Sequence, residues 1–516
     1  MFRMIILVSV CFQFVKSDQK RILAVFPTPS ISHQVVFRPF VLELAKRGHE
    51  VTVITTDPGY KNGQSPKNLR EIDVHDISYG IWTNFTSVER GTTGGHVEDL
   101  KLAYVLLADV FEAQVQSSEV QNLINNKNEK FDLLITETCV RPSLSLSYIY
   151  DVPVIDFSSF GGTINTYLDL GGIEHPLLYP TPMQQKFRNI GLWEKIYQTY
   201  IYYALKHMYS HLEIRENKML KRVFGPKIPE LSELKKNIHL RFLNVNPIWD
   251  VNRPIPPNFI YIGGLHNRKE KELPRDLKNI LESSKYGVIY ISFGTNVKPS
   301  LLPLDKLKIF VKVFSELPYD VLWKWDQEEF PDCPKNVIIS KWYPQSDLLK
   351  HPKINLFITQ AGLQSSDEAI AAAVPVIGIP LLGDQYFNAE HFEVHNIGIK
   401  LNMESLTEKQ LKNAINATIE DPKYRKNIRK LRRVLSDQPQ TPLERAVWWT
   451  EYVLRNNGAE HLRAVGAGLH WSQYYELELI FLMLSIIMTI FIALIGFLLN
   501  FAYMKIFRVH IKLKLN

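Results

Sequence analysis

Short hydrophobic runs alternate with segments of helical periodicity along most of the chain, and this alternation predicts an α/β fold. In the first half, apolar runs at 21–26 and 50–55 flank a segment at 32–47 whose apolar positions recur at helical spacing. This order predicts a β-α-β unit. Two further runs, at 131–136 and 152–157, are almost continuously apolar, which is typical of parallel strands that helices cover on both faces.

The same alternation restarts in the second half of the chain. Between the halves lie a proline-rich stretch at 246–258 and a densely charged run at 267–272, and both are more typical of a linker than of a core. We therefore expect one domain at 18–265 and a second at 266–450, facing one another across a cleft that holds the ligands. The strands predicted for the second domain are 286–293, 319–325, 336–340, 354–359 and 375–380.

The two ends of the chain have a different pattern. Arg3 precedes an apolar run, and small or permissive residues up to Ser17 allow cleavage there, which predicts a secretory signal peptide at 1–17. A buried N-terminal strand or helix is the alternative. Residues 479–499 carry no charge over 21 positions, enough to cross about 30 Å of hydrocarbon as a helix. We expect a transmembrane helix at 479–503, preceded by a connecting helical segment at 451–478.

The tail at 504–516 is basic, and the positive-inside rule leaves it in the cytoplasm with the body of the protein in the lumen. Lys512 and Lys514 resemble the dilysine retrieval signal of endoplasmic-reticulum membrane proteins. We therefore expect a single-pass protein of the endoplasmic-reticulum membrane. Asn84 and Asn416 begin glycosylation sequons, which are compatible with a lumenal body.

Composition narrows the function classes. The chain has 516 residues, of which 46% are hydrophobic and 22% charged, and this excludes a disordered, collagen-like or disulfide-dense protein. Its net charge of +7 comes mostly from cations at the two ends, so a nucleic-acid partner is not indicated. Beyond the signal peptide only Cys139 and Cys333 remain, and one disulfide between them is an open alternative.

A 44-residue segment from Trp342 to Gln385 carries the most specific signal in the chain. It begins with Trp-Tyr-Pro-Gln and ends with Asp-Gln. The segment resembles the signature of the UDP-glycosyltransferases, and the similarity extends to the signal peptide, the first β-α-β unit, the linker and the anchored tail. The resemblance implies the GT-B architecture, in which two Rossmann-like domains face across a cleft, plus one C-terminal transmembrane helix. It also implies an N-terminal acceptor-binding domain and a C-terminal UDP-sugar-binding domain.

The residues of this segment also have a physical interpretation. Gly362 ends a strand, and Gln364, Ser365 and Ser366 lead into a helix, whose first N–H groups and positive end can hold a diphosphate. No Asp-x-Asp triplet occurs in the sequence. We therefore expect no metal and no cofactor, with the UDP-sugar acting as a co-substrate.

The resemblance assigns further donor-binding roles by matching positions. Trp342 would stack on the uracil ring and Gln345 would pair with its edge. Glu368 would accept hydrogen bonds from the ribose. The sugar hydroxyls would be held by Asp384 and Gln385, and the phosphates would be lined by Gly294, Thr295 and Gln360.

His33 follows the first strand, at the start of the next helix, where the family carries its catalytic base. A helix N-terminus disfavours the imidazolium ion, which keeps the ring able to accept a proton. Glu137, directly after the strand at 131–136, matches the family's acidic partner and would orient the ring. Taken alone, a histidine at a helix start is more often a cap or a surface residue.

Two differences from the family pattern bear on whether the protein is an active enzyme or a non-catalytic relative. Glu137 stands where the family usually has Asp, and Gln360-Ala361-Gly362 stands where it often has His-Gly-Gly. We expect an inverting hexosyltransferase that forms a β-glycoside with a small lipophilic hydroxylated acceptor. Insect-like features favour glucose, and glucuronic acid stays open. The alternatives are a non-catalytic UDP-sugar carrier or sensor and a membrane-tethered adhesion protein, and a homo-oligomer stays open as well.

The acceptor side is less specific. Trp193, Tyr197, Tyr200 and Met208 recur at helical spacing in an aromatic stretch. The first interpretation is an ordinary core stripe. The alternatives are an apolar acceptor pocket and a helix that rests on the bilayer surface.

Overall fold

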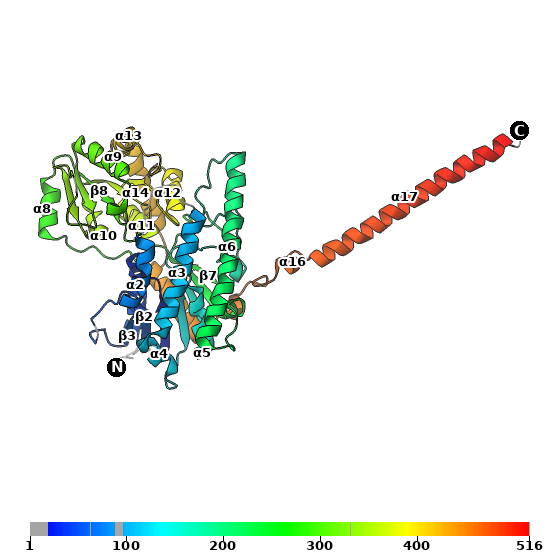
Figure 1. Cartoon of the computed structure of the whole chain (residues 1–516), viewed down its shortest axis with the longest axis horizontal. Coiled ribbons are helices and arrows are strands. Elements are labelled where there is room, and N and C mark those ends of the chain that lie inside the picture. The colour runs from blue at the N-terminus through cyan, green and yellow to red at the C-terminus, as the bar shows by residue number, and fades with distance from the viewer. Residues whose placement is uncertain (1–18, 62, 88–95, 331, 515–516) are drawn as a thin grey trace, which may run out of the picture. The chain divides into compact units, whose positions relative to one another are not determined.

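The structure is a computed structural model that describes residues 19–514, apart from 62, 88–95 and 331. The predicted signal peptide at 1–17 lies outside the described residues. The chain forms two compact units that divide after Ala464. The first unit contains two lobes, each built on a parallel sheet (Figure 1).

The N-terminal sheet has seven strands in the order β3-β2-β1-β4-β5-β6-β7, and neighbouring strands are parallel. The strands predicted at 21–26, 50–55, 131–136 and 152–157 are confirmed as β1, β2, β4 and β5. Three strands were not predicted: β3 is a charged edge strand, β6 carries a buried arginine, and β7 is only three residues long. The bounds are β1 Arg21–Phe26, β2 Glu50–Thr55, β3 Leu69–Asp73, β4 Leu133–Glu137, β5 Val154–Ser158, β6 Ile238–Leu243 and β7 Phe259–Tyr261.

Helices cover this sheet. The helix predicted at 32–47 is α1, whose buried face packs Phe37 and Phe40 against the strands. The other long helices are α3 and α6, which pack on one another. The bounds are α1 Ile31–Lys46, α2 His75–Thr86, α3 His96–Gln116, α4 Ser118–Asn125, α5 Ser145–Tyr150, α6 Leu192–Phe224 and α7 Leu231–Leu234.

The second sheet has six parallel strands in the order β10-β9-β8-β11-β12-β13. All five strands predicted for this half are confirmed, and only the short β13 was missed. The strands are β8 Val288–Ser292, β9 Asp320–Lys324, β10 Val337–Ser340, β11 Ile354–Thr359, β12 Val376–Gly378 and β13 Gly398–Lys400. The helices are α8 Arg275–Ser283, α9 Leu304–Ser315, α10 Gln345–Leu348, α11 Leu363–Ala372, α12 Gln385–Val394, α13 Glu408–Glu420 and α14 Pro422–Ser436.

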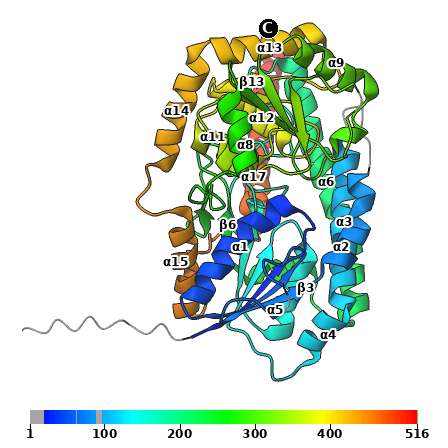
Figure 2. The ribbon, with the colours of Figure 1, turned by 90° about the vertical axis from the view of Figure 1, so that its left-hand side faces the viewer.

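After α14 the chain returns to the first sheet. Helix α15 (Pro442–Arg455) packs beside α1 (Figure 2). Its Ala446, Val447 and Val453 join the same buried cluster as Phe40. Residues predicted as the end of the C-terminal domain thus complete the N-terminal core. We call residues 19–265 together with 442–464 the N-terminal lobe, and residues 266–441 the C-terminal lobe.

The interpretation of residues 246–258 as a linker is wrong. Trp249 is buried, and its indole N–H donates to Asn388 Oδ1 of the C-terminal lobe at 2.9 Å. Asp250 is also buried and accepts hydrogen bonds from Tyr167 and Tyr261 at 2.8 and 2.7 Å. These proline-rich residues are therefore a packed irregular segment. The charged run at 267–272 is exposed throughout, as expected for a crossing between the lobes.

In the second unit, α17 (Leu477–Lys514) is the one helix of the described residues that is long and apolar enough to cross a membrane. It includes the span predicted at 479–503 and continues through the described part of the basic tail. The expected helical connection at 451–478 is mostly irregular. Besides the end of α15 and the first two residues of α17, it holds only the turn at Glu460–Leu462 and the short α16 (Trp471–Tyr474).

Three remaining expectations can be placed. The predicted core stripe on α6 is wrong for Trp193, Tyr197 and Tyr200, which are exposed, and only Met208 of that set is buried. Both cysteines are free: Cys139 is buried and Cys333 exposed, so they form no disulfide. Of the sequon asparagines, Asn84 is exposed near the end of α2 and Asn416 is half-buried on α13. Their glycosylation stays a prediction.

Candidate active site

A cleft of about 730 Å³ lies between the two lobes. Its walls come from loops after the carboxyl ends of parallel strands and from the first turns of α1 and α11, the position expected of a ligand site in doubly wound sheets. The predicted residues that line it are His33, Gly294, Thr295, Trp342, Gln345, Gln360, Gly362, Gln364, Ser365, Glu368, Asp384 and Gln385. Glu137 lies behind His33, at the end of β4.

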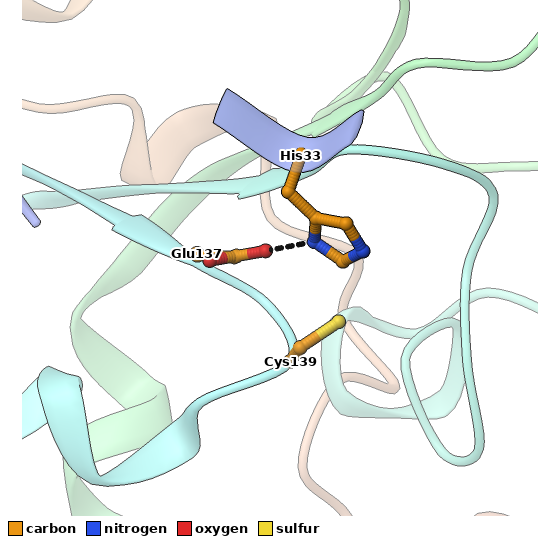
Figure 3. A group of neighbouring side chains, drawn as sticks. All are labelled: His33, Glu137 and Cys139. Carbon is orange, nitrogen blue, oxygen red and sulfur yellow. Dashed lines mark hydrogen bonds and ion pairs between the residues drawn. The ribbon is translucent and has the colours of Figure 1, made fainter. Parts of the chain in front are cut away.

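His33 and Glu137 are 104 positions apart in sequence and meet because their elements are neighbours. Glu137 is the last residue of β4, which pairs with β1, and α1 follows β1 after a short loop. The carboxyl ends of the two strands therefore meet at one edge of the sheet. His33 lies in the first turn of α1 and points toward that edge (Figure 3).

The Glu137 carboxylate orients the His33 ring. His33 Nδ1 lies 2.5 Å from Glu137 Oε1, and the other carboxylate oxygen accepts from the backbone N–H of Thr28 at 3.2 Å. Ser159 Oγ lies 2.9 Å from the same ring nitrogen. A carboxylate can only accept, so Nδ1 carries the proton. The lone pair is then on Nε2, which points away from Glu137 (Figure 3). The ring is thus prepared to act as a general base.

The glutamate found in place of the family's usual aspartate is compatible with this geometry. Its side chain is completely buried and reaches Nδ1 directly while it keeps the bond to Thr28. The extra methylene therefore does not separate the carboxylate from the ring.

The same side chains form a group that could hold a metal ion. Ligand atoms of His33, Glu137 and Cys139 all lie within 4.8 Å of one another (Figure 3). Imidazole, carboxylate and thiolate suit Zn²⁺. A cation bound at Nδ1 would, however, move the ring proton to Nε2 and remove the lone pair needed for base catalysis. Burial also raises the pKa of the Cys139 thiol, which favours its protonated form.

Residues of the C-terminal lobe approach His33 from across the cleft. Gln364 Nε2 donates to the backbone oxygen of Ser159 at 3.0 Å, and Asn296 Nδ2 donates to Ser30 Oγ at 3.1 Å. Ser159 contacts the His33 ring, and Ser30 is the residue at the N-cap position of the helix that carries it. The His33 ring and helix α11 are therefore held close together, and Gln364 acts as a bridge between the lobes.

Helix α11 begins at the cleft with Gly362 as its N-cap, which has no side chain to cap the first N–H groups, and the Asp384 carboxylate accepts from the N–H of Leu363. These donors and the positive helix end suit a diphosphate. The preceding residue, Ala361, has a φ of 65°, a left-handed conformation where the family often has glycine. Gly294, with a φ of 78°, lies opposite, where an added Cβ would be 2.0 Å from Gln360 Nε2. Glycine is thus required there for Gln360 to reach the cleft wall.

Gln345 and Glu368 form one polar network. The Gln345 amide donates to Glu368 Oε2 at 2.7 Å and to Ser365 Oγ at 2.9 Å, and its oxygen accepts from Tyr290 at 3.1 Å. Both polar atoms of this amide are already partnered, so Gln345 orients Glu368 as well as lining the cleft. Burial raises the pKa of Glu368, and the bond from Gln345 opposes that shift.

Asp384 and Gln385 begin α12 on the same side. Asp384 Oδ2 accepts from Asn388 at 2.8 Å, while burial raises the pKa of this carboxyl. Gln385 Oε1 accepts from the backbone N–H groups of Leu381 and Leu382 at 2.9 and 3.0 Å and so holds the loop before the helix.

Sequence reasoning missed Lys324, the last residue of β9. Its ammonium lies 4.7 Å from the centre of the Trp342 ring and donates to the Gly294 carbonyl at 2.7 Å. Burial lowers its pKa to about 8. A lysine at the carboxyl end of a strand with an apolar centre was the available signal. Trp342 itself is 57% exposed and offers a flat face in the cleft.

His266 was also missed. Its Nε2 lies 3.2 Å from the backbone oxygen of Gln364, and burial lowers its pKa to about 4. The ring is therefore neutral at ordinary pH, and it supports the bridge between the lobes.

The N-terminal half of the cleft has an extended apolar wall, beside which Arg38 and Asp99 also line the cleft. Phe160 makes an edge contact with the His33 ring, with 5.6 Å between the ring centres. The other apolar side chains of this wall are Val35, Trp82, Phe85, Leu100, Tyr104, Leu107 and Met183. A lipophilic molecule can therefore be accommodated beside the base.

Solved glycosyltransferases share the two-lobed architecture. The glycotransferase of kitacinnamycin superposes with a TM-score of 0.57 at 17% identity, covering 84% of this chain and 99% of that one. The calicheamicin glycosyltransferase CalG4 gives 0.53 at 16% identity, covering 85% and 99%. These likenesses confirm the predicted GT-B fold.

Sequence comparison identifies the family. A family model described as UDP-glucoronosyl and UDP-glucosyl transferase matches residues 21–513. An ecdysteroid UDP-glucosyltransferase of Spodoptera littoralis nuclear polyhedrosis virus is 36% identical, over 95% of this chain and 98% of its own length. UDP-glucosyltransferase 2 of Dactylopius coccus is 32% identical, over 93% and 92%. The chain therefore belongs to the UDP-glucoronosyl and UDP-glucosyl transferase family and is a glycosyltransferase with a UDP-sugar donor.

Proposed function

We propose that the protein transfers glucose from UDP-glucose to a hydroxyl group of a small lipophilic acceptor, with inversion, to give a β-glucoside. The observation that carries this proposal is the oriented His33–Glu137 pair, which faces the donor-side residues across one cleft. An apolar wall beside the base supports a lipophilic acceptor.

The proposed reaction is a single displacement. His33 Nε2 takes the proton of the acceptor hydroxyl, and that oxygen attacks the anomeric carbon of the sugar from the face opposite UDP. The bond between this carbon and the diphosphate oxygen breaks, and UDP leaves with the bonding electrons. The first N–H groups of α11 stabilise the departing charge, and Glu137 stabilises the imidazolium.

The relatives support the choice of sugar and acceptor. Both sequence relatives described above are named UDP-glucosyltransferases, and the viral one is named for ecdysteroids. A flat polycyclic alcohol matches an apolar wall made of Trp82, Phe85 and Phe160.

A transfer assay with several donors and acceptors tests the proposal. UDP-glucose with a hydroxylated steroid or phenol should give product, and UDP-glucuronic acid should give less. Activity should persist after treatment with a chelator, because the proposed steps use no metal ion. Tight binding of UDP-glucose without product from any acceptor would instead indicate a carrier.

We also propose that α17 anchors the protein in the endoplasmic-reticulum membrane with a lumenal body. Its mean hydropathy of 2.9 supports a span, and the cations at its end support a cytoplasmic tail. Protease protection of the body in sealed microsomes, with an accessible tail, would test this orientation.

Trp342→Ala should weaken UDP binding about 5- to 150-fold, because stacking of a base on an aromatic ring contributes about 1–3 kcal/mol. Calorimetry with UDP measures the effect. Trp448→Ala is the matched control, since Trp448 is 41% exposed on α15, outside the cleft. Equal affinities of the two variants would contradict the stacking role.

The catalytic efficiency for UDP-glucose should fall above a pH of about 8, where Lys324 loses its charge beside the proposed diphosphate site. Burial lowers the pKa of Lys324 to about 8, so the side chain is charged below that pH and neutral above it. The Lys324→Met variant should have a lower catalytic efficiency than the unmodified enzyme at neutral pH, without the fall above pH 8. The Lys324→Arg variant should keep its catalytic efficiency at higher pH. If the catalytic efficiency of Lys324→Met fell by the same factor above pH 8, the pH dependence would belong to another titrating group.

A further inference from the structure

Helix α6 has two faces of different character. The helix is 33 residues long. On its inner face, Ile201, Leu205, Met208 and Leu212 pack in a buried cluster with residues of α3. This inner face explains why the helix is held on the lobe. The outer face is not needed for that packing.

The outer face of the first half of α6 is strongly aromatic. Trp193 is 81% exposed, Tyr200 66% and Tyr203 61%. Leu192, Ile196 and Tyr197 are exposed beside them. We call these six residues the aromatic face. Large apolar side chains gathered at this density on a surface indicate an interaction site.

The exposed charges on this helix have one sign. Every exposed charged residue of α6 is basic: Lys195, Arg215, Lys218, Lys221 and Arg222. Its three glutamates are not exposed, and Glu194 and Glu213 are hydrogen-bonded within the lobe. Arg215, Lys221 and Arg222 form ion pairs with Asp109, Glu230 and Glu112, so Lys195 and Lys218 are the cations of α6 that we assign to an anionic lipid surface.

We propose that the aromatic face of α6 lies on the surface of the lipid bilayer that α17 spans. This inference rests on the proposed membrane anchoring. Trp and Tyr rings prefer the membrane–water interface, and Lys195 and Lys218 match anionic headgroups.

The tether between the two units allows this contact. The twelve residues 465–476 separate the first unit from α17 and span at most about 43 Å when fully extended. The body is therefore held near the bilayer. The tether itself has exposed Trp471, Tyr474 and Tyr475 just before the span, as in an interfacial aromatic belt.

The contact would place the acceptor side of the cleft close to lipid. Leu100, Tyr104 and Met183 line the cleft and belong to the same buried cluster as the inner face of α6. One helix and one layer of side chains thus separate the bilayer surface from the cleft. An acceptor dissolved in the membrane would have a short path to the base.

The full chain in vesicles of phosphatidylcholine and phosphatidylserine tests the proposal. In a Cys333→Ser background, which removes the exposed thiol, Tyr200→Cys carries a fluorophore. Tyr286→Cys is the matched control, a tyrosine that is 54% exposed on the C-terminal lobe. The label at position 200 should be quenched several-fold more by nitroxide lipids than by aqueous iodide, and the label at 286 should show the reverse.

The outcomes separate this proposal from the anchoring. If the protein floats with the vesicles but the label at 200 is quenched by iodide as strongly as the label at 286, the membrane contact is wrong and the anchor stands. If the protein does not float, the anchor itself fails. Protection of position 200 from both quenchers would assign the aromatic face to a second copy of the chain and overturn the proposal. Trp193→Ser with Tyr203→Ser should lower the lipid quenching without releasing the protein from the vesicles.

Discussion

His33→Ala is expected to lower kcat for glucosyl transfer by about 10²- to 10⁴-fold, the usual contribution of a positioned general base. Without the imidazole, no group takes the proton as the acceptor oxygen attacks. Affinity for UDP should stay close to that of the unmodified enzyme, because the proposed UDP contacts come from the C-terminal lobe. Single-turnover transfer and calorimetry with UDP measure the two effects separately.

His351→Ala is the control for that experiment. His351 lies in the turn before β11 and does not line the cleft. Its removal should leave kcat near the original value. A loss of UDP binding in His33→Ala with kcat preserved would reverse the proposed division of labour between the lobes.

Glu137→Gln should lower kcat by about 10- to 100-fold, because a hydrogen bond to a charged group contributes about 1.5–3 kcal/mol. The amide keeps the size of the side chain but cannot stabilise the imidazolium by charge. It can also donate to Nδ1 and so favour the tautomer with its proton on Nε2. The pH dependence of kcat should change as well as its value. A purely structural role of Glu137 would lower kcat without changing its pH dependence.

Glu137→Asp separates charge from reach. The aspartate keeps the negative charge and is one methylene shorter than the glutamate that now contacts Nδ1 at 2.5 Å. It should retain more activity than Glu137→Gln. If both variants were fully active, the carboxylate would have no part in the reaction.

Hydrophobic patterning predicted the central strands well, because strands buried on both faces are apolar throughout. It failed where burial depends on tertiary partners. Residues 246–258 contain prolines that suggest a linker, yet Trp249 and Asp250 are buried by residues from distant parts of the chain. Likewise α15 completes the N-terminal core, although its sequence follows the C-terminal lobe.

Helix α6 shows a second limit. Its periodicity was visible, but periodicity does not say which of two apolar faces meets the core. The structure buries Met208 and exposes Trp193. An aromatic face that looks like core in sequence is therefore a surface here.

Most residues of the proposed donor side could be placed together from sequence, because they follow one another in the contiguous motif from Trp342 to Gln385, and the structure finds them in one cleft. The supporting contacts were not. Lys324, Ser159 and Asn296 come from separate segments of the chain and have no shared spacing, so only the fold brings them together.

The anomeric configuration of the product tests the central claim most directly. Proton NMR of the glucoside formed from UDP-α-glucose reports which face of the sugar the acceptor attacked. One displacement assisted by His33 predicts a β-glucoside. An α-glucoside from the same donor would contradict it.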